Sequence, residues 1–452
     1  MPQTAGGDGC RSPREAMDAA AGAGGDGCRS PPVSWERRAR GYPERMTLRP
    51  LDQSNKLKDV LYEIRGAALA EAGRLEADGH KILKLNTGNP AIFGFDAPYQ
   101  IVRDMIEAVP YAHGYSDSRG IMSARRAVVS RYEEIPDFPK FDPDDVFLGN
   151  GVSELITMTM QALLDAGDEV LIPSPDYPLW TAMTSLAGGN PVHYRCDPEG
   201  DWQPDLEDIR SRITEHTKAI VVINPNNPTG SVYTRETLQG IVDIAREHSL
   251  LLLADEIYDR ILYDGAQHIN LATLAPDLLC LTFNGLSKTY RVAGYRSGWV
   301  VITGPTQHAS GFLEGINLLA STRLCPNVPA QHAVQAALSG VQSIDALIGP
   351  TGRLHEQRDV AWEGLEAIPG VTCYRPQGAL YAFPRLDPDV YEIRDDEKLI
   401  YDLLVAEHVL VVQGTGFNWP TPDHFRIVTL PESRVLADAV ERIGNFLASY
   451  KQ

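Results

Sequence analysis

The sequence predicts an α/β protein with a large domain on a mainly parallel sheet and a smaller α/β domain. From Leu48 onward, short β-branched or leucine-rich runs alternate with helical stretches, which is typical of a sheet whose strands are joined by helices. The runs are apolar on both faces, as expected of strands covered by helices on either side. A second pattern, with helix-like stretches around short strands, begins near residue 340 and continues to the end.

Turn-forming residues bound each strand candidate of the first pattern. The candidates are EVLIP (169–173), AIVVIN (219–224), SLLLLAD (249–255), LLCLTFN (278–284) and GWVVIT (298–303). The second pattern contributes GALYAFP (378–384) and HFRIVTL (424–430). A chain of 452 residues suits two or three domains. We expect a segment of the smaller domain at 46–95, the large domain at 96–339 and the rest of the smaller domain at 340–452.

The first 45 residues differ from the rest of the chain, being rich in Gly, Ala, Pro and Arg, and GGDGCRSP occurs at 6–13 and again at 24–31. Such a segment has too little apolar surface to offset the entropy lost on ordering, so we expect residues 1–45 to be a disordered tail. Two hypotheses stay open: the tail belongs to the native protein, or Met46 is the functional start. The intact mass of the native protein distinguishes them.

Composition excludes several classes of function. The 41 basic and 60 acidic residues give a net charge of -19, which disfavours nucleic acids and anionic membranes as partners. The six cysteines include no CxxC pair and the eleven histidines no HExxH motif, so no metal site is expected. No apolar run approaches the roughly 20 residues of a membrane span, and the N-terminus lacks a signal-peptide pattern. We therefore expect a cytoplasmic enzyme with reduced thiols.

Lys288 is the first candidate for chemistry. It follows a predicted strand in FNGLSKTYRVAGYRSGW (283–299), in a turn rich in Gly and Ser. A lysine amine forms an imine with a carbonyl group when a desolvated, cation-rich pocket lowers its pKa. Arg296, eight residues on, would supply positive charge and bind a phosphate through paired N–H groups. A solvated charge pair is the alternative interpretation.

Asp255 is the second candidate, at the carboxyl end of the apolar run in LLLLADEIYDRI (250–261), with Tyr258 three residues later. Open parallel sheets bind ligands at that edge. A buried carboxylate needs a partner, and the protonated nitrogen of a pyridine ring is one; its charge makes the ring an electron sink. The alternative is an aspartate that caps a following helix.

Two further segments carry polar groups at strand ends. In VVINPNNPTG (221–230), Asn227 is placed to donate to a phenolic oxygen, or it satisfies only its own turn. In FLGNGVSELITMTMQALL (147–164), a strand leads through GVS into a helix. Backbone N–H groups at that helix start would bind a phosphate, with the Ser153 hydroxyl added, unless Ser153 only caps the helix.

These four segments, in this order, resemble the class I and II aminotransferases, of pyridoxal-phosphate fold type I. The resemblance covers roughly residues 48–450, and the strings NPNNPTG, ADEIYDRI and FNGLSKTYRVAGYR are specific in combination. GLSKTYRVAGYR, LYEIRG and HFRIVTLP are most similar to the bacterial alanine aminotransferases. The resemblance implies a seven-stranded sheet in the large domain, a smaller domain built from both chain ends and a homodimer with active sites at the subunit interface.

The resemblance also implies the roles of individual residues. Lys288 would bind pyridoxal phosphate covalently and then move the substrate α-proton, while Asp255 pairs with the pyridine nitrogen. Tyr258 and Asn227 would bond the phenolic oxygen of the ring, and Tyr177 of PSPDYP would stack on its face. The groups expected near the phosphate or the lysine are Arg296, Ser153, the Val152 N–H, Ser287 and, from the neighbouring subunit, Tyr115 of YSDSRG.

For the substrate, the resemblance implies that Arg426 in DHFRIV binds the α-carboxylate, assisted by Asn227 and by the backbone of Gly88 in NTGNP. The planar guanidinium suits a carboxylate better than lysine does; an ion pair on a strand face is the alternative. Arg323 is a candidate for a distal carboxylate. Tyr62 and Arg65 of LYEIRG would lie over the substrate, or simply belong to an amphipathic helix.

We expect transfer of the amino group of L-alanine to 2-oxoglutarate, giving pyruvate and L-glutamate in a ping-pong reaction. Aspartate or a branched-chain amino acid is the alternative donor. The same fold also supports carbon-sulfur lyases, which share the carbanion step, and the cofactor-sensing domain of transcription regulators. The regulator alternative needs a basic winged-helix module that residues 1–45 are too few and too Gly-rich to form.

Overall fold

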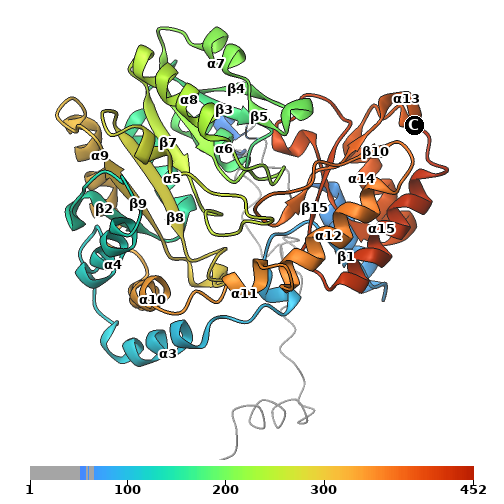
Figure 1. The fold of residues 1–452 in the computed structure, drawn as a ribbon, viewed down its shortest axis with the longest axis horizontal. Helices are drawn as coiled ribbons and strands as arrows, with labels where there is room; N and C mark the ends of the chain where they lie inside the picture. Colours follow the sequence, from blue (N-terminus) through green and yellow to red (C-terminus); the bar gives the residue numbers. More distant parts are fainter. Residues whose placement is uncertain (1–50, 58–59, 61–65) are drawn as a thin grey trace, which may run out of the picture. The chain divides into compact units, whose positions relative to one another are not determined.

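The computed structural model describes residues 51–57, 60 and 66–452, and the elements discussed below lie within residues 54–452, which form one compact unit. The predictions for the tail at 1–45 and for Met46 fall outside the described residues. The predicted α/β class is confirmed: helices cover both faces of a central sheet (Figure 1).

The central sheet has the strand order β2-β9-β8-β7-β6-β3-β4-β5. Its strands are β2 (Val146–Gly149), β3 (Glu169–Ser174), β4 (Asn190–Asp197), β5 (Gln203–Pro204), β6 (Thr217–Ile223), β7 (Leu251–Asp255), β8 (Cys280–Gly285) and β9 (Gly298–Thr303). Neighbours from β4 to β8 pair in parallel, whereas β9 runs antiparallel to both β8 and β2. The sheet has one strand more than the seven predicted. This additional strand, β5, is two residues long and pairs antiparallel with β4.

Alternate residues of the strands pack on opposite faces of the sheet, as the period of a β-strand requires. In β6, Val221 and Ile223 belong to one hydrophobic core, whereas Ile220 and Val222 belong to the core on the other face. The helices around the sheet are α3 (Tyr99–Ala108), α4 (Met122–Glu133), α5 (Val152–Leu163), α6 (Leu179–Ala187), α7 (Leu206–Arg212), α8 (Arg235–His248), α9 (Ser310–Thr322) and α10 (Val328–Ser339).

The smaller domain is built from both ends of the described chain, because β1 pairs in parallel with β13 (Figure 1). Its elements are α2 (Ala67–Ala77), β1 (Leu83–Lys84), α11 (Asp345–Ile348), α12 (Arg353–Glu366), β10 (Val371–Thr372), β11 (Tyr381–Ala382), β12 (Arg385–Leu386), α13 (Pro388–Tyr391), α14 (Asp396–Glu407), β13 (Val409–Leu410), β14 (Val412–Gln413), β15 (Phe425–Val428) and α15 (Ser433–Leu447). The domain boundaries at 46–95, 96–339 and 340–452 stay a prediction.

Local sequence explains where these helices begin and which face they bury. The side chain of Thr234 accepts the N–H of Thr237 at the start of α8, and Asp395 caps α14 in the same way. Helix α15 buries residues three or four apart, which gives it one apolar face against the smaller domain; they are Leu436, Ala439, Val440, Ile443 and Leu447.

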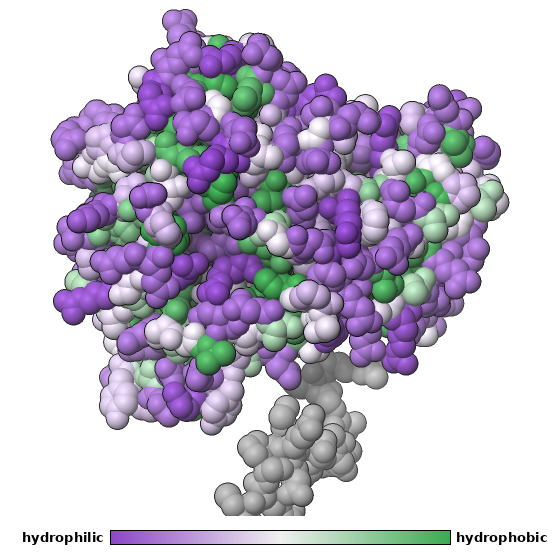
Figure 2. Space-filling view, viewed as in Figure 1, coloured by the Kyte–Doolittle hydropathy of each residue, from purple (hydrophilic) through white to green (hydrophobic). Residues whose placement is uncertain are grey.

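Hydrophilic residues cover most of the face shown in Figure 2, and hydrophobic ones form small separate areas there. Within the part of the chain that the structure describes, no helix has the length and apolar character needed to cross a membrane.

Candidate active site

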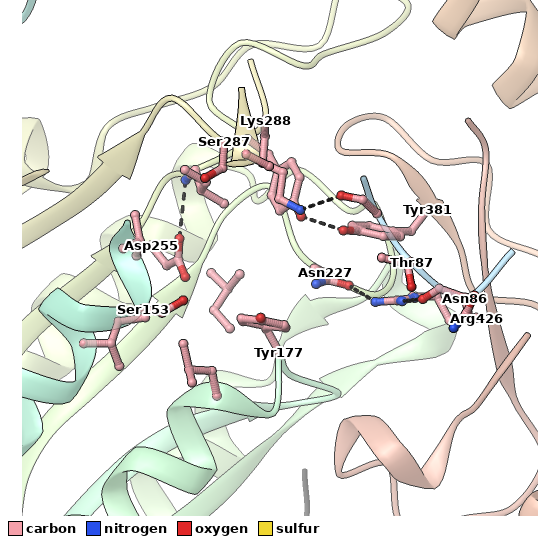
Figure 3. A pocket seen from close by; sticks show the side chains of 18 of the residues that line it. Asn86, Thr87, Ser153, Tyr177, Asn227, Asp255, Ser287, Lys288, Tyr381 and Arg426 are labelled. Carbon is pink, nitrogen blue, oxygen red and sulfur yellow. Dashed lines mark hydrogen bonds between the residues drawn. The ribbon is translucent and has the colours of Figure 1, made fainter. Parts of the chain in front are cut away.

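A pocket of about 370 Å³ lies at the carboxyl ends of the parallel strands, next to the loops that follow β6, β7 and β8 (Figure 3). This is the edge at which open parallel sheets bind ligands. Both domains contribute to it, because β11 and β15 of the smaller domain line its far side. The predicted site residues that line the pocket are Gly88, Val152, Ser153, Tyr177, Asn227, Asp255, Tyr258, Ser287, Lys288, Arg296 and Arg426.

Lys288 extends into the pocket from the loop after β8. Its amine donates to the carbonyl oxygen of Gly88 over 2.9 Å, and its nitrogen lies 5.7 Å from the centre of the Tyr258 ring. Lys288 is half-buried. Ser287 lines the pocket beside it. The lysine is therefore placed against polar groups of the pocket, and not in a solvated charge pair.

Asp255, the last residue of β7, is 4% exposed. One carboxylate oxygen accepts the indole N–H of Trp180 over 3.0 Å and the other accepts the backbone N–H of Ile257 over 3.4 Å. Burial raises the pKa of Asp255 to about 6, although the hydrogen bond from Trp180 acts in the opposite direction. The residues after Asp255 form turns and not the helix that the capping alternative requires. Asp255 is thus a buried carboxylate that lines the pocket. A cationic partner in the pocket would keep this carboxylate ionised.

An anion-binding cradle is formed where α5 begins. Gly151 precedes the helix with φ +81°, and a Cβ there would lie 2.3 Å from an Nη atom of Arg296. Arg296 donates to the carbonyl oxygens of Ala293 and Asn150. The N-cap is Gly151, so Ser153, the second residue of α5, is not the helix cap; Glu154 accepts the backbone N–H of Asn150 over 2.8 Å. Exposed N–H groups, a hydroxyl and a guanidinium therefore converge as a phosphate requires.

Arg426, on β15, occupies the side of the pocket opposite this cradle (Figure 3). It is 3% exposed, and its guanidinium carbon lies 4.5 Å from the ring centres of both Tyr381 and Phe417. Its Nη atoms donate to the Asn227 side-chain oxygen over 3.1 Å and to the Asn86 carbonyl over 2.6 Å. A guanidinium stacked between two rings keeps a fixed plane, which favours paired hydrogen bonds to a carboxylate.

The loop after β3 is joined to the smaller domain through Asp176, next to the pocket residue Tyr177. The Asp176 N–H donates to the carbonyl oxygen of Phe417 over 2.9 Å, and its carboxylate accepts hydrogen bonds from Asn418 over 2.6 Å and Thr181 over 3.0 Å. Asp176 is fully buried, and burial raises its pKa to about 7. These contacts join the loop that carries Tyr177 to Phe417, whose ring packs against Arg426.

Arg323, the candidate for a distal carboxylate, does not line this pocket of the described chain, and its role stays a prediction. Its guanidinium donates to the carbonyl oxygens of Ser118 and Leu148 and lies 3.1 Å from a carboxylate oxygen of Glu154. These contacts hold it against the end of β2 and the start of α5, so packing determines its position.

Three other predicted residues are not in this pocket of the described chain. Tyr115 is 84% exposed and lies outside it; its contact with a neighbouring subunit stays a prediction. Tyr62 and Arg65 lie outside the described residues.

The sequence analysis missed several residues that the structure brings to the site. Tyr381 lines the pocket from β11, and its hydroxyl lies 2.7 Å from that of Tyr258. Asn86 and Thr87 line it beside the predicted Gly88. Trp180, whose indole N–H donates to Asp255, lies near the start of α6, three residues after the predicted Tyr177.

The site therefore combines four chemical features: an amine, a buried carboxylate, the cradle at the start of α5 and a buried arginine. An amine can react with a carbonyl group, a buried carboxylate can stabilise positive charge on a ligand, and a guanidinium can bind a carboxylate. The described residues contain no group of three or more His, Cys, Asp or Glu arranged to hold a metal ion.

Comparison with known proteins defines the class. The model of the family "Aminotransferase class I and II" matches residues 80–443, so the chain belongs to this family of pyridoxal-phosphate-dependent aminotransferases. It is 71% identical over 404 residues to the alanine aminotransferase of Mycobacterium tuberculosis (strain ATCC 25618 / H37Rv), covering 89% of this chain and 94% of that protein.

Two further comparisons agree. The chain is 57% identical over 403 residues to the glutamate-pyruvate aminotransferase AlaA of Escherichia coli (strain K12), covering 89% of this chain and 99% of that protein. The crystal structure of an aminotransferase from Escherichia coli superimposes with a TM-score of 0.88 at 57% identity, covering 89% of this chain and all of that one. The predicted family and fold type are confirmed.

Proposed function

We propose that this enzyme transfers the amino group of L-alanine to 2-oxoglutarate, with pyridoxal phosphate bound covalently through Lys288. The observation that carries the proposal is that Lys288, Asp255, the cradle at α5 and Arg426 all line one pocket. Two relatives at 57% identity or more are named for alanine or glutamate-pyruvate transamination. When bound, the cofactor supplies an electron sink for the bonds around the substrate α-carbon.

The residues of the pocket suit this cofactor in three places. Val152, Ser153 and Arg296 would hold its phosphate at the start of α5, where Gly151 gives the guanidinium room. Asp255 would pair with the protonated ring nitrogen, which would lower the pKa that burial raises. Hydrogen bonds from Asn227 and Tyr258 would reach its phenolic oxygen, with Tyr177 against the ring.

The substrate would be oriented by its carboxylate. Arg426 would exchange its contacts with Asn227 and Asn86 for paired hydrogen bonds to the α-carboxylate, and the backbone of Gly88 adds a further contact. Lys288 would then take the α-proton as general base and return a proton as general acid. Because both substrates carry an α-carboxylate, the same arginine serves both halves of a ping-pong reaction.

Alanine is favoured over aspartate as the donor. Relatives named for alanine or glutamate-pyruvate transamination support this choice. Steady-state assays across amino donors with 2-oxoglutarate test this choice. We expect the highest specificity constant for alanine; an aspartate value exceeding it roughly tenfold, about 1.4 kcal/mol in transition-state binding, overturns the choice. Keto acid released without added 2-oxoglutarate would instead indicate a lyase.

We also propose a homodimer that acts in the cytoplasm. Large apolar side chains are exposed along and after α3, as expected of a surface that pairs with a second copy; they are Tyr99, Ile106, Val109, Tyr111 and Tyr115. Among the described residues, four cysteines are free thiols, which supports a reducing compartment. Sedimentation of the holoenzyme tests the dimer, and a monomer with full activity contradicts it.

A further inference from the structure

Tyr381 links the two halves of the pocket. It lies on β11 and is 2% exposed, and its hydroxyl lies 2.7 Å from the hydroxyl of Tyr258. The Arg426 guanidinium packs over its ring. A Cβ on Gly88 would lie 2.2 Å from the Tyr381 oxygen, so this hydroxyl lies close to the Gly88 backbone. The carbonyl of the same residue accepts the hydrogen bond from the Lys288 amine (Figure 3).

The number of protons in this cluster fixes the direction of its hydrogen bonds. If Tyr258 donates its one proton to the phenolic oxygen of the cofactor, as the proposed function requires, it must accept the proton of Tyr381. The Tyr381 oxygen is then left as an acceptor. Lys288 lines the same pocket and donates to the Gly88 carbonyl beside this oxygen, and the neutral amine has two N–H groups to donate.

We propose that Tyr381 is a positioning residue that orients the free amine of Lys288. Its hydroxyl oxygen and the Gly88 carbonyl accept the two N–H groups, so that the nitrogen lone pair is directed into the pocket at the substrate α-carbon. In that step the Cα–H bond would break and an N–H bond would form on Lys288, and the cofactor, when bound, would supply the sink for the electron pair left on Cα. The inference rests on the proposed function and adds a residue that it does not use.

The charges around Tyr381 suit an acceptor. Burial raises its pKa, but the positive charges of Lys288 and Arg426 and the hydrogen bonds with Tyr258 and Lys288 outweigh burial and lower the pKa below its usual value. Burial instead raises the pKa of Tyr258 well above its usual range, so that this residue keeps its proton. Tyr381 thus has the more acidic of the two hydroxyls, which suits it to donate its proton to Tyr258.

Tyr381→Phe removes the oxygen and leaves the ring under Arg426. We expect kcat of the alanine half-reaction to fall roughly 10- to 100-fold, with KM for alanine changed by less than about threefold, because orientation of the base is lost and substrate binding is kept. The kinetic isotope effect with α-deuterated alanine should increase, since proton transfer becomes slower than the other steps. The absorbance of the bound cofactor should remain.

Gly88→Ala is a second perturbation that displaces the Tyr381 hydroxyl without removing it, and it should give the same kinetic pattern. The matched control is Tyr263→Phe: Tyr263 is equally buried and its hydroxyl donates to the Ala379 carbonyl, two residues from Tyr381 but outside the pocket. This control should leave kcat and the isotope effect at wild-type values.

Two outcomes overturn the inference. One is a Tyr381→Phe enzyme with the kcat and isotope effect of the Tyr263→Phe control. The other is a loss confined to KM, which would make Tyr381 a substrate-binding residue only. Failure of the proposed function is distinguishable from both, because the wild-type enzyme would then show neither cofactor absorbance nor transamination.

Discussion

Trp180→Phe offers a test of how the protein keeps Asp255 ionised. Trp180 is fully buried, packs edge-on against Phe283 and supplies one of two N–H donors to the carboxylate. A hydrogen bond to a charged group contributes about 1.5–3 kcal/mol, and each pKa unit corresponds to about 1.4 kcal/mol. Loss of the indole N–H should therefore raise the pKa of Asp255 in the cofactor-free enzyme from about 6 to roughly 7–8.

Cofactor affinity reports this change, because a protonated Asp255 must lose its proton before it pairs with the ring nitrogen. From these pKa values, the variant should bind pyridoxal phosphate about 2- to 10-fold more weakly than wild type at pH 7 and about 5- to 50-fold more weakly at pH 6. At pH 9 the two affinities should converge. Absorbance titrations between pH 6 and 9 measure the ratio of the two cofactor affinities. The effects of titrating groups that both proteins share cancel in this ratio.

Trp299→Phe is the matched control, since Trp299 is also buried in the sheet but donates to the Tyr132 hydroxyl, remote from the pocket. It should lower stability without changing the pH dependence of cofactor binding. A Trp180→Phe to wild-type ratio that stays constant from pH 6 to 9 would refute the reasoning.

Two further predictions concern the substrate arginine and the contact between domains. Arg426→Lys should lower kcat/KM for alanine roughly 100-fold, about 3 kcal/mol, because lysine cannot form the paired hydrogen bonds; unchanged steady-state kinetics would contradict the assigned role, and cofactor absorbance should persist. Asp176 has a folded pKa of about 7 against an ordinary value of 3.8, so the folded state binds its proton more tightly. Its contribution to stability therefore falls as pH rises from about 4 to 7, by at most about 4 kcal/mol. Asp176→Asn should flatten this dependence in thermal melts at pH 5 and 8, and an equal slope in both proteins would show that Asp176 is not responsible.

Much of the fold follows from the sequence because buried parallel strands are continuous apolar runs. The runs at 169–173, 219–224, 249–255 and 278–284 coincide with β3, β6, β7 and β8. GWVVIT became β9 but runs antiparallel. Direction is set by the path of the connecting loop, and an antiparallel strand buried on both faces has the same apolar pattern as a parallel one.

Parts of the site depend on packing that the sequence does not contain. Arg323 and Arg426 are both arginines near predicted elements. Arg323 is held by the backbone carbonyls of Ser118 and Leu148, whereas Arg426 lines the pocket. Tyr381 belongs to a strand of only two residues, too short for alternation to show which face it uses. Site residues within recognisable motifs could be predicted from the sequence, whereas most of those that the smaller domain contributes could not.

The covalent attachment of the cofactor to Lys288 is the central claim, and borohydride reduction of the purified enzyme tests it most directly. Reduction makes the imine bond permanent, and peptide mass mapping then locates it. The account predicts one added cofactor mass on the peptide that contains Lys288 and none in Lys288→Ala. A label on another lysine, or Lys288→Ala enzyme that still binds the cofactor covalently and transaminates at the normal rate, would contradict it.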